Sequence, residues 1–174
     1  MDDPRFPKTV YFIMFVAGLF QWVRYYPRLP ERMASHFGFD GMPNGWQAKD
    51  NFFLVMLVVV GLTGVITFLA PRFIAARPDS QINLPHKAYW LAPARREATF
   101  RFIGAQMAWF GCAVLFIVLF GTFLAIRANL SPDGRFDNGT MVKVMAGFVF
   151  ATMLWMVRFI RHFFRLPEEF SSRP

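Results

Sequence analysis

Four long apolar segments, separated by polar loops, dominate the pattern of hydrophobic and polar positions along the chain. They cover Thr9–Val23, Asn51–Ala70, Phe102–Ile126 and Met141–Val157. A helix needs about 20 residues to cross the hydrocarbon core of a bilayer, which the second and third segments supply. The first and fourth have apolar cores of about 15–17 residues and need snorkelling ends or local thinning of the bilayer. The pattern predicts an all-α, polytopic integral membrane protein whose four transmembrane helices form a single domain over residues 1–174.

The segment between the first two apolar stretches is polar and rich in proline and glycine. Pro27 and Pro30 prevent the first helix from continuing, because proline lacks the amide hydrogen that a helix uses. For the same reason Pro71 is expected to end the second helix. Asp40-Gly41 and Asn44-Gly45 are both strong turn signals, so we expect a compact loop that folds back over the bundle. Three larger side chains are expected to be buried beneath it: His36, Phe37 and Trp46.

The composition supports a membrane protein rather than a soluble fold. Of 174 residues, 55% are hydrophobic and 23 are phenylalanine, which is more apolar surface than a soluble domain of this size hides. The formal net charge is +8, but Lys and Arg lie at segment ends and in loops rather than in one basic tract. This distribution favours anionic lipid headgroups as partners and argues against nucleic acid. The single cysteine, Cys112, excludes an intramolecular disulfide and a cysteine-based zinc site within one chain.

The basic residues also predict an orientation in the membrane. Twelve Lys and Arg residues fall on the N-terminal tail, the central loop and the C-terminal end, against seven on the opposite side. Cytoplasmic segments carry the excess of positive charge, so both termini and the central loop are expected in the cytoplasm. The loops at about 24–50 and 127–139 then face outward, and the compact first loop is extracytoplasmic.

Small residues at helical spacing predict where helices approach closely. Gly104 and Ala108 are four residues apart in the third span, as are Gly147 and Ala151 in the fourth. This spacing lets helix backbones pack against each other, either within one chain or between subunits.

Three arginines lie on one face of an extended fourth helix. Arg158, Arg161 and Arg165 are spaced by three and four residues, which places them together near the end of the span. They are candidate contacts for lipid headgroups. Two interpretations remain open, because such arginines either anchor the bundle in general or form a specific phospholipid site.

Few polar side chains are arranged for chemistry. His36 and Asp40 are a candidate metal or pH-sensing pair, but two ligands are too few for a metal site, and a hydrogen-bonded structural histidine is favoured. No Asp or Glu lies in the core of a span, which argues against an ion-coupled transporter. The sequence contains no zinc-protease, nucleophile-elbow or phosphate-loop motif. We therefore predict that the protein is not an enzyme and uses no metal or cofactor.

The residue order of the first loop resembles a known family. The loop reads Tyr26-x-x-Leu-Pro30-x-x-Met-Ala-x-His36-Phe-x-x-x-Gly41-x-Pro43-Asn-x-Trp46-x-x-Lys49. This run is similar to the signature of the bacterial SdpI-like membrane family, and the resemblance covers about residues 10–70. The namesake of the family is an immunity protein against a sporulation-delaying toxin, and the shared module is otherwise a domain of unknown function. Candidate ligand- or partner-binding residues in the loop are Tyr26, Pro30, His36, Asp40, Gly41, Pro43, Trp46 and Lys49.

The resemblance implies a non-catalytic protein of the bacterial cytoplasmic (inner) membrane. Its role would be immunity, resistance or the sensing of an envelope signal, with the outer loop meeting an external peptide. The alternative is an accessory structural subunit that packs against a larger membrane complex through its small-residue seams. A homo-oligomer would use the same helix faces. Membrane lipids are expected partners in each case, so the hypotheses differ in whether the loop or the helix faces carry the function.

Overall fold

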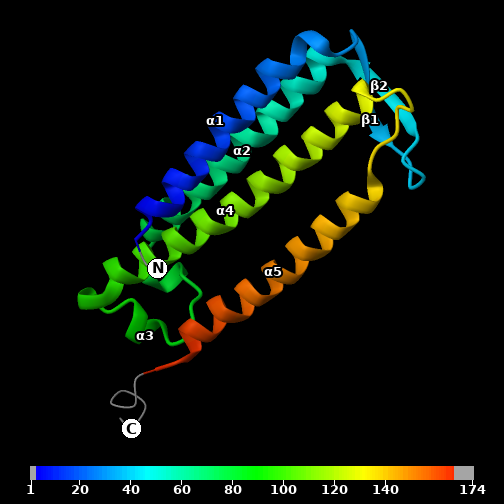
Figure 1. Cartoon of the computed structure of the whole chain (residues 1–174). Helices are drawn as coiled ribbons and strands as arrows, with labels where there is room; N and C mark the ends of the chain where they lie inside the picture. The colour runs from blue at the N-terminus through cyan, green and yellow to red at the C-terminus, as the bar shows by residue number, and fades with distance from the viewer. Residues whose placement is uncertain (1–2, 167–174) are drawn as a thin grey trace.

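Four long helices make up most of the computed structural model, which describes residues 3–166 (Figure 1). They are α1 (Arg5–Tyr25), α2 (Lys49–Ala75), α4 (Pro93–Leu130) and α5 (Asn138–Phe164). Each is long and apolar enough to cross a membrane. The predicted all-α, multi-pass membrane architecture is therefore confirmed, although every helix extends beyond its predicted apolar segment.

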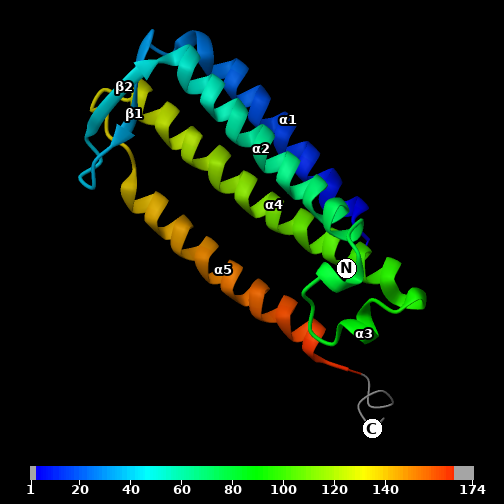
Figure 2. The ribbon, with the colours of Figure 1, turned by 180° about the vertical axis from the view of Figure 1, so that it is seen from behind.

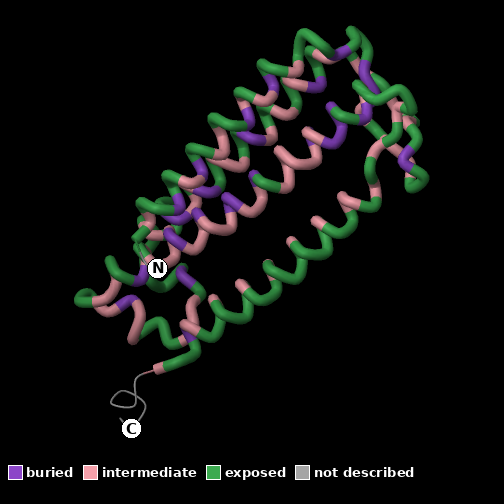
Figure 3. The backbone as a smooth tube through the Cα atoms, in the orientation of Figure 1, coloured by how far each residue is buried: buried purple, intermediate pink, exposed green. Residues whose placement is uncertain are grey.

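The packed core lies between α1, α2 and α4, which run side by side (Figures 1 and 2). Tyr11 of α1 is buried, and its ring meets the ring of Phe68 edge-on at a centroid distance of 4.9 Å. Its hydroxyl donates a hydrogen bond to the carbonyl oxygen of Val60 at 3.4 Å. From α4, Cys112 and Leu115 complete this core. Buried positions accordingly gather on these three helices (Figure 3).

Helix α5 is packed much more sparsely than the other three. Phe163 is its only buried residue, and most of its length is exposed (Figure 3). The helix begins with a cap, because the carboxylate of Asp137 accepts a hydrogen bond from the amide of Thr140 at 2.9 Å. Along its length, the Trp155 indole donates to the side-chain oxygen of Gln106 on α4 at 3.1 Å. A few polar and aromatic contacts therefore hold α5 to the core.

Proline does not end α2, which corrects the expectation from the sequence. The helix continues through Pro71 to Ala75, and Pro71 is itself buried. Proline removes one backbone hydrogen bond, but a membrane helix tolerates this loss when neighbouring helices pack around the site.

The chain makes one excursion at each end of the bundle (Figures 1 and 2). A 3-10 turn, η1 (Tyr26–Arg28), and a hairpin of β1 (Arg32–Phe37) and β2 (Pro43–Ala48) connect α1 to α2. A second 3-10 turn, η2 (Asp79–Gln81), and the one-turn helix α3 (Lys87–Trp90) connect α2 to α4 at the other end. We call these the hairpin end and the α3 end. The predicted compact loop is thus an antiparallel hairpin, a detail that the turn signals alone did not specify.

Candidate functional site

The predicted binding loop forms a short, closed hairpin. β1 and β2 pair antiparallel, with Ala34 opposite Trp46 and His36 opposite Gly45. At the tip, the amide of Gly38 donates to the carbonyl of Met42 at 2.8 Å. Gly41 follows with a φ of 78°, a left-handed conformation that glycine adopts without strain. The turn expected at Asp40-Gly41 is therefore confirmed, but the one expected at Asn44-Gly45 is wrong, because both residues lie within β2 and Gly45 pairs with His36.

Two asparagine side chains from distant parts of the chain fix the hairpin backbone. Asn129, in the last turn of α4, accepts a hydrogen bond from the amide of Ala34 at 2.7 Å and donates to its carbonyl at 2.9 Å. Asn138, the first residue of α5, donates to the carbonyls of Gly38 and Phe39 at 2.8 and 2.9 Å. Both strand and tip are therefore held by directional bonds to the helices beneath them.

The base of the hairpin is closed by side chains that the sequence had proposed for ligand binding. The Lys49 ammonium forms an ion pair with Glu31 at 2.8 Å and lies over the ring of Tyr26, 4.7 Å from its centroid. The Tyr26 hydroxyl in turn donates a hydrogen bond to Asp50. Tyr26 directly follows α1 and Lys49 is the first residue of α2. These two side chains therefore connect the adjacent ends of α1 and α2 to the base of the hairpin.

The prediction that His36 and Trp46 are buried is wrong. His36 is exposed, and 52% of the Trp46 surface is accessible. The hairpin instead packs on the bundle through Met33, which is 0% exposed and belongs to the hydrophobic core. Only Phe37 follows the expectation in part, since it is half-buried and its ring lies 5.0 Å from that of Phe136. Side chains alternate between the faces of a strand, and here Trp46 belongs to the outward set.

The remaining predicted loop residues lie around the tip and the base. Pro30 is exposed and Pro43 is half-buried, whereas Gly41 is buried beside the chain entering α5. The carboxylate of Asp40 accepts a hydrogen bond from the amide of Met42 at 3.0 Å. Within residues 3–166, no group of three or more His, Cys, Asp or Glu is placed to hold a metal ion.

A cavity of about 390 Å³ lies under the hairpin, between α2, α4 and the start of α5. His36 and Phe37 line it from the hairpin, and Phe52, Thr122 and Asn138 line it from the helices. The ring of His36 also occupies the space above Gly45, where an added Cβ would approach it within 3.2 Å. His36 therefore faces an opening at the edge of the hairpin rather than a closed core.

The three arginines at the end of the chain's fourth span line one cavity at the α3 end. They are Arg158, Arg161 and Arg165, and the cavity, of about 780 Å³, lies between α3, α4 and α5. Its wall includes Trp90, whose indole donates to the carbonyl of Phe163 at 3.0 Å. Arg158 and Arg161 belong to α5, whereas Arg165 follows its last residue, so the predicted helical face does not extend to Arg165. Their contact with lipid headgroups stays a prediction.

The small residues proposed as helix seams have different surroundings. Ala108 is fully buried in the core, but Gly104 and Gly147 have nothing within 4 Å of the position where a Cβ would lie, and Ala151 is exposed. Close approaches within the chain are made instead at Gly111, against Thr67, and at Gly18, against Leu119. The structure therefore does not place Gly104 or Gly147 in a seam within the monomer, and packing between subunits stays a prediction.

Sequence reasoning missed the two asparagines that fix the hairpin. Asn129 contacts a residue 95 positions earlier, and Asn138 contacts the tip from 99 and 100 positions away. The only local signal was an amide side chain at each end of the short loop 130–137, next to the expected outer loop. That signal predicts a polar contact but not its partner.

The chain is similar to one known family over part of its length. Residues 12–62 match DUF1648, a domain of unknown function. The match contains most of α1, the whole hairpin and the first half of α2, the region where the sequence resembled the SdpI-like family. No curated protein and no solved structure matches the chain. The comparisons therefore place a domain of unknown function within the helical, membrane-type fold and name no specific activity.

Proposed function

We propose that the protein is a non-catalytic bacterial inner-membrane protein whose hairpin recognises an external peptide, in immunity, resistance or the sensing of an envelope signal. One observation carries this proposal. Asn129 and Asn138 fix the hairpin backbone, while Phe39 and Trp46 remain exposed on it. Apolar side chains on a fixed backbone suit recognition, because little conformational freedom is lost when a partner binds.

The free backbone edge of β2 favours an extended peptide as the partner of the hairpin. On β1, both backbone polar groups of Ala34 are used by Asn129. β2 pairs only with β1 among the strands of residues 3–166, and Trp46 on it is half exposed. An extended peptide adds to a free strand edge through main-chain hydrogen bonds and places alternate side chains against the receptor. Trp46 is the large side chain available for such contacts.

The proposal requires the hairpin to face outward, with both termini in the cytoplasm. This orientation is testable because Cys112, the single cysteine, is buried. Cysteine would be introduced at exposed Phe39 or at exposed Ser80 in the connection from α2 to α3. A membrane-impermeant maleimide should label Phe39→Cys in intact cells and Ser80→Cys only after lysis. The reverse pattern would refute the orientation.

Recognition is tested by His36→Ala and Trp46→Ala. Each variant would be expressed in the native host lacking its own copy, and survival or reporter output would be compared in medium containing the peptides that the host encounters. Both variants should insert normally but lose protection or signalling. Asn51→Ala, at an exposed position on the first turn of α2, is the control and should behave as wild type. Full activity of both hairpin variants would refute this function.

The second candidate function is an accessory subunit of a larger membrane complex. The sparse packing of α5 favours it, since Phe163 is the only buried residue of this helix. The test is purification of the tagged protein from native membranes in mild detergent, with partner stoichiometry read by mass spectrometry. A stoichiometric partner that is lost in Gly147→Leu would support this candidate. Recovery alone or as a homo-oligomer would exclude it.

A further inference from the structure

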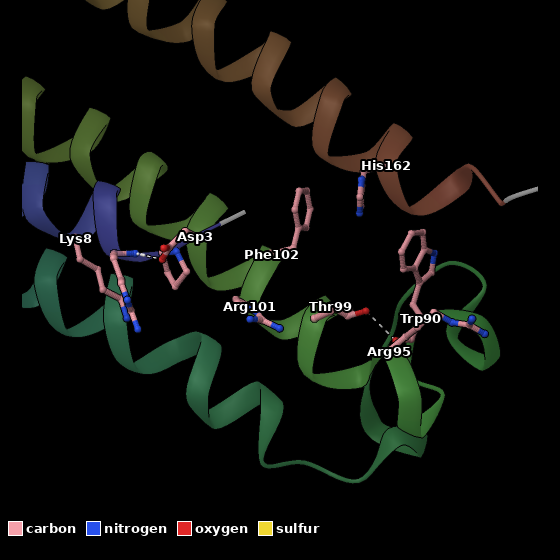
Figure 4. A pocket seen from close by; sticks show the side chains of 11 residues that line it. Asp3, Lys8, Trp90, Arg95, Thr99, Arg101, Phe102 and His162 are labelled. Carbon is pink, nitrogen blue, oxygen red and sulfur yellow. Dashed lines mark hydrogen bonds between the residues drawn. The ribbon is translucent and has the colours of Figure 1, made fainter. Parts of the chain in front are cut away.

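Three cavities meet at one side chain, Lys8, near the start of α1 at the α3 end. The largest, about 840 Å³, lies between α1, α3, α4 and the end of α5. Figure 4 shows it with Asp3 and Lys8 on one side, Trp90 and His162 on the other, and Phe102 between them. A second cavity of about 210 Å³ continues between α1, α2 and α4. A third, about 450 Å³, follows the groove between α1 and α2. Because Lys8 lines all three, the cavities adjoin at its side chain.

Cationic side chains from three helices surround this junction. Arg5 and Lys8 come from α1, Arg72 from α2 and Arg101 from α4. Arg101 has only a long ion pair of 3.8 Å with Glu97 on its own helix. Within residues 3–166, the side chains of Lys8 and Arg72 make no ion pair or hydrogen bond. The described residues therefore leave the charges of Lys8 and Arg72 at this junction without a neutralising partner.

A single carboxylate also lines the largest cavity. Asp3 accepts a hydrogen bond from the backbone amide of Arg5 at 2.8 Å, so its charge lies at the first turn of α1 (Figure 4). A negative charge near a helix N-terminus is favourable to the helix itself. One carboxylate against four cations leaves the junction strongly basic.

The groove between α1 and α2 is apolar for most of its length. Gly61 and Gly64 form part of its wall, and nothing lies within 4 Å of an added Cβ at Gly61. Lys8 and Arg72 are the charged residues that line it. The rest of the lining is apolar or aromatic and consists of Tyr11, Phe12, Phe15, Val60, Val65 and Phe68. A basic entrance thus leads into an apolar channel on the surface of two membrane-spanning helices.

We propose that the α3 end binds one anionic phospholipid, with its phosphate among Arg5, Lys8, Arg72 and Arg101 and one acyl chain in the groove between α1 and α2. The phosphate chemistry alone would also fit a soluble phosphate ester. The groove favours the lipid, because a soluble ester would leave it unfilled. Basic pockets between membrane helices are the sites where anionic lipid headgroups bind. The assignment is independent of what the hairpin recognises.

The headgroup is tested by Lys8→Gln combined with Arg72→Gln. Native mass spectrometry of the purified full-length protein in detergent would measure binding of added phosphatidylglycerol or phosphatidylcholine. Two cations near a membrane surface account for about 30-fold in affinity, so phosphatidylglycerol should bind about 30-fold more weakly and phosphatidylcholine should be unaffected. The charge-preserving pair Lys8→Arg and Arg72→Lys should retain binding, which separates lost charge from lost folding.

A matched control removes two charges from the other end of the molecule. Arg127 and Lys143 are exposed and lie near the hairpin, so Arg127→Gln with Lys143→Gln should leave phosphatidylglycerol binding unchanged. Equal loss in this control would show a general charge effect and overturn the site. Unchanged binding in the Lys8 and Arg72 variant would overturn it as well.

The acyl chain is tested by Gly61→Leu, which adds a side chain to the groove at a position with open space. Gly147→Leu, also at a helical glycine with open space, is the matched control. Gly61→Leu should weaken the binding of long-chain phosphatidylglycerol but not of dihexanoyl phosphatidylglycerol. Gly147→Leu should change the binding of neither lipid. Glycerol 3-phosphate should fail to displace the long-chain lipid. If glycerol 3-phosphate displaced the long-chain lipid at equal concentration, and Gly61→Leu did not change lipid binding, the site would be assigned to a soluble phosphate ester. That result would overturn the proposed lipid site.

Discussion

The two ends of the bundle hold their connecting segments by different combinations of contacts. At the hairpin end, Asn129 makes two hydrogen bonds, of 2.7 and 2.9 Å, to the backbone of Ala34. At the α3 end, Arg96 donates hydrogen bonds to the carbonyl oxygens of Ala75 and Arg77 at 2.8 and 3.2 Å. Ring contacts add to these bonds, since His162 stacks on Phe102 at a centroid distance of 3.9 Å and lies 5.0 Å from Trp90. Hydrogen bonds depend steeply on angle and distance, whereas aromatic pairs accept a range of arrangements. The backbone of β1 is thus held in one shape, whereas the ring contacts of α5 at the α3 end tolerate more adjustment.

The two ends also differ in whether their cationic side chains are paired with carboxylates. Lys49 at the hairpin is neutralised by Glu31 at 2.8 Å. Lys8 and Arg72 at the α3 end have no such partner within residues 3–166. A fixed, locally neutralised surface suits recognition of a defined partner, and an adaptable basic one suits a mobile lipid. The comparison predicts that hairpin variants lose stability through specific bonds and that α3-end variants lose less.

Asn129→Ala should have the largest effect. It leaves the amide and carbonyl of buried Ala34 without partners, at roughly 1–3 kcal/mol for each group. The free energy of unfolding should fall by about 2–6 kcal/mol in an SDS titration of the detergent-solubilised protein. Amide hydrogen exchange over residues 32–48 should accelerate. Asn51→Ala is the control, and unchanged exchange in Asn129→Ala would show that the amide does not fix the hairpin.

Gly41→Ala should have the second largest effect on the free energy of unfolding, and Gly134→Ala is its control. Both glycines have positive φ, 78° and 63°, so alanine strains either one by about 1–2 kcal/mol. At Gly41 the new Cβ would also lie 2.6 Å from the carbonyl oxygen of Phe136, whereas Gly134 faces open space. We expect a loss of about 2–4 kcal/mol for Gly41→Ala in the same titration. Equal losses of unfolding free energy in the two variants would show that contact with the Phe136 carbonyl oxygen does not contribute.

Trp90→Phe tests the α3 end, with a smaller expected loss of about 1 kcal/mol. Phenylalanine preserves an aromatic ring next to His162 but removes the hydrogen bond from the indole to the carbonyl of Phe163. The SDS titration should show this modest change, and exchange over residues 32–48 should stay as in wild type. A loss as large as that of Asn129→Ala would contradict the proposed difference between the ends.

The smallest effect concerns pH and the cap of α5. Hydrogen bonds from the Thr140 hydroxyl and amide hold the pKa of Asp137 below its ordinary value. A lowered pKa in the folded state means that the ionised cap stabilises fully above the unfolded value of about 3.9. That contribution is lost as the pH falls through the folded-state pKa. The difference in unfolding free energy between wild type and Asp137→Asn should therefore be constant from pH 7 to pH 5 and shrink below pH 4. A difference that grew on acidification would contradict the lowered pKa of Asp137.

The sequence predicted the features that depend on local pattern. The four spans follow from runs of apolar residues, and Gly41 follows from a turn dipeptide. The arrangement of the hairpin on the bundle could not be predicted, because it depends on Asn129 and a partner 95 residues away. The expectation for Pro71 failed because packing around α2 compensates for a lost backbone bond. Gly104 and Gly147 show the same limit, since their spacing permits close packing but cannot say which helix supplies the neighbour.

The sparse packing of α5 has a consequence for biogenesis. Helices α1, α2 and α4 contain nearly all of the buried residues, so this core is complete once the third span has been inserted. α5 is synthesised after these three helices and docks through Trp155 and Phe163. Its first residue, Asn138, holds the tip of the hairpin. We therefore expect the hairpin surface to mature only after α5 has been synthesised, because the tip lacks its bonds to Asn138 until then.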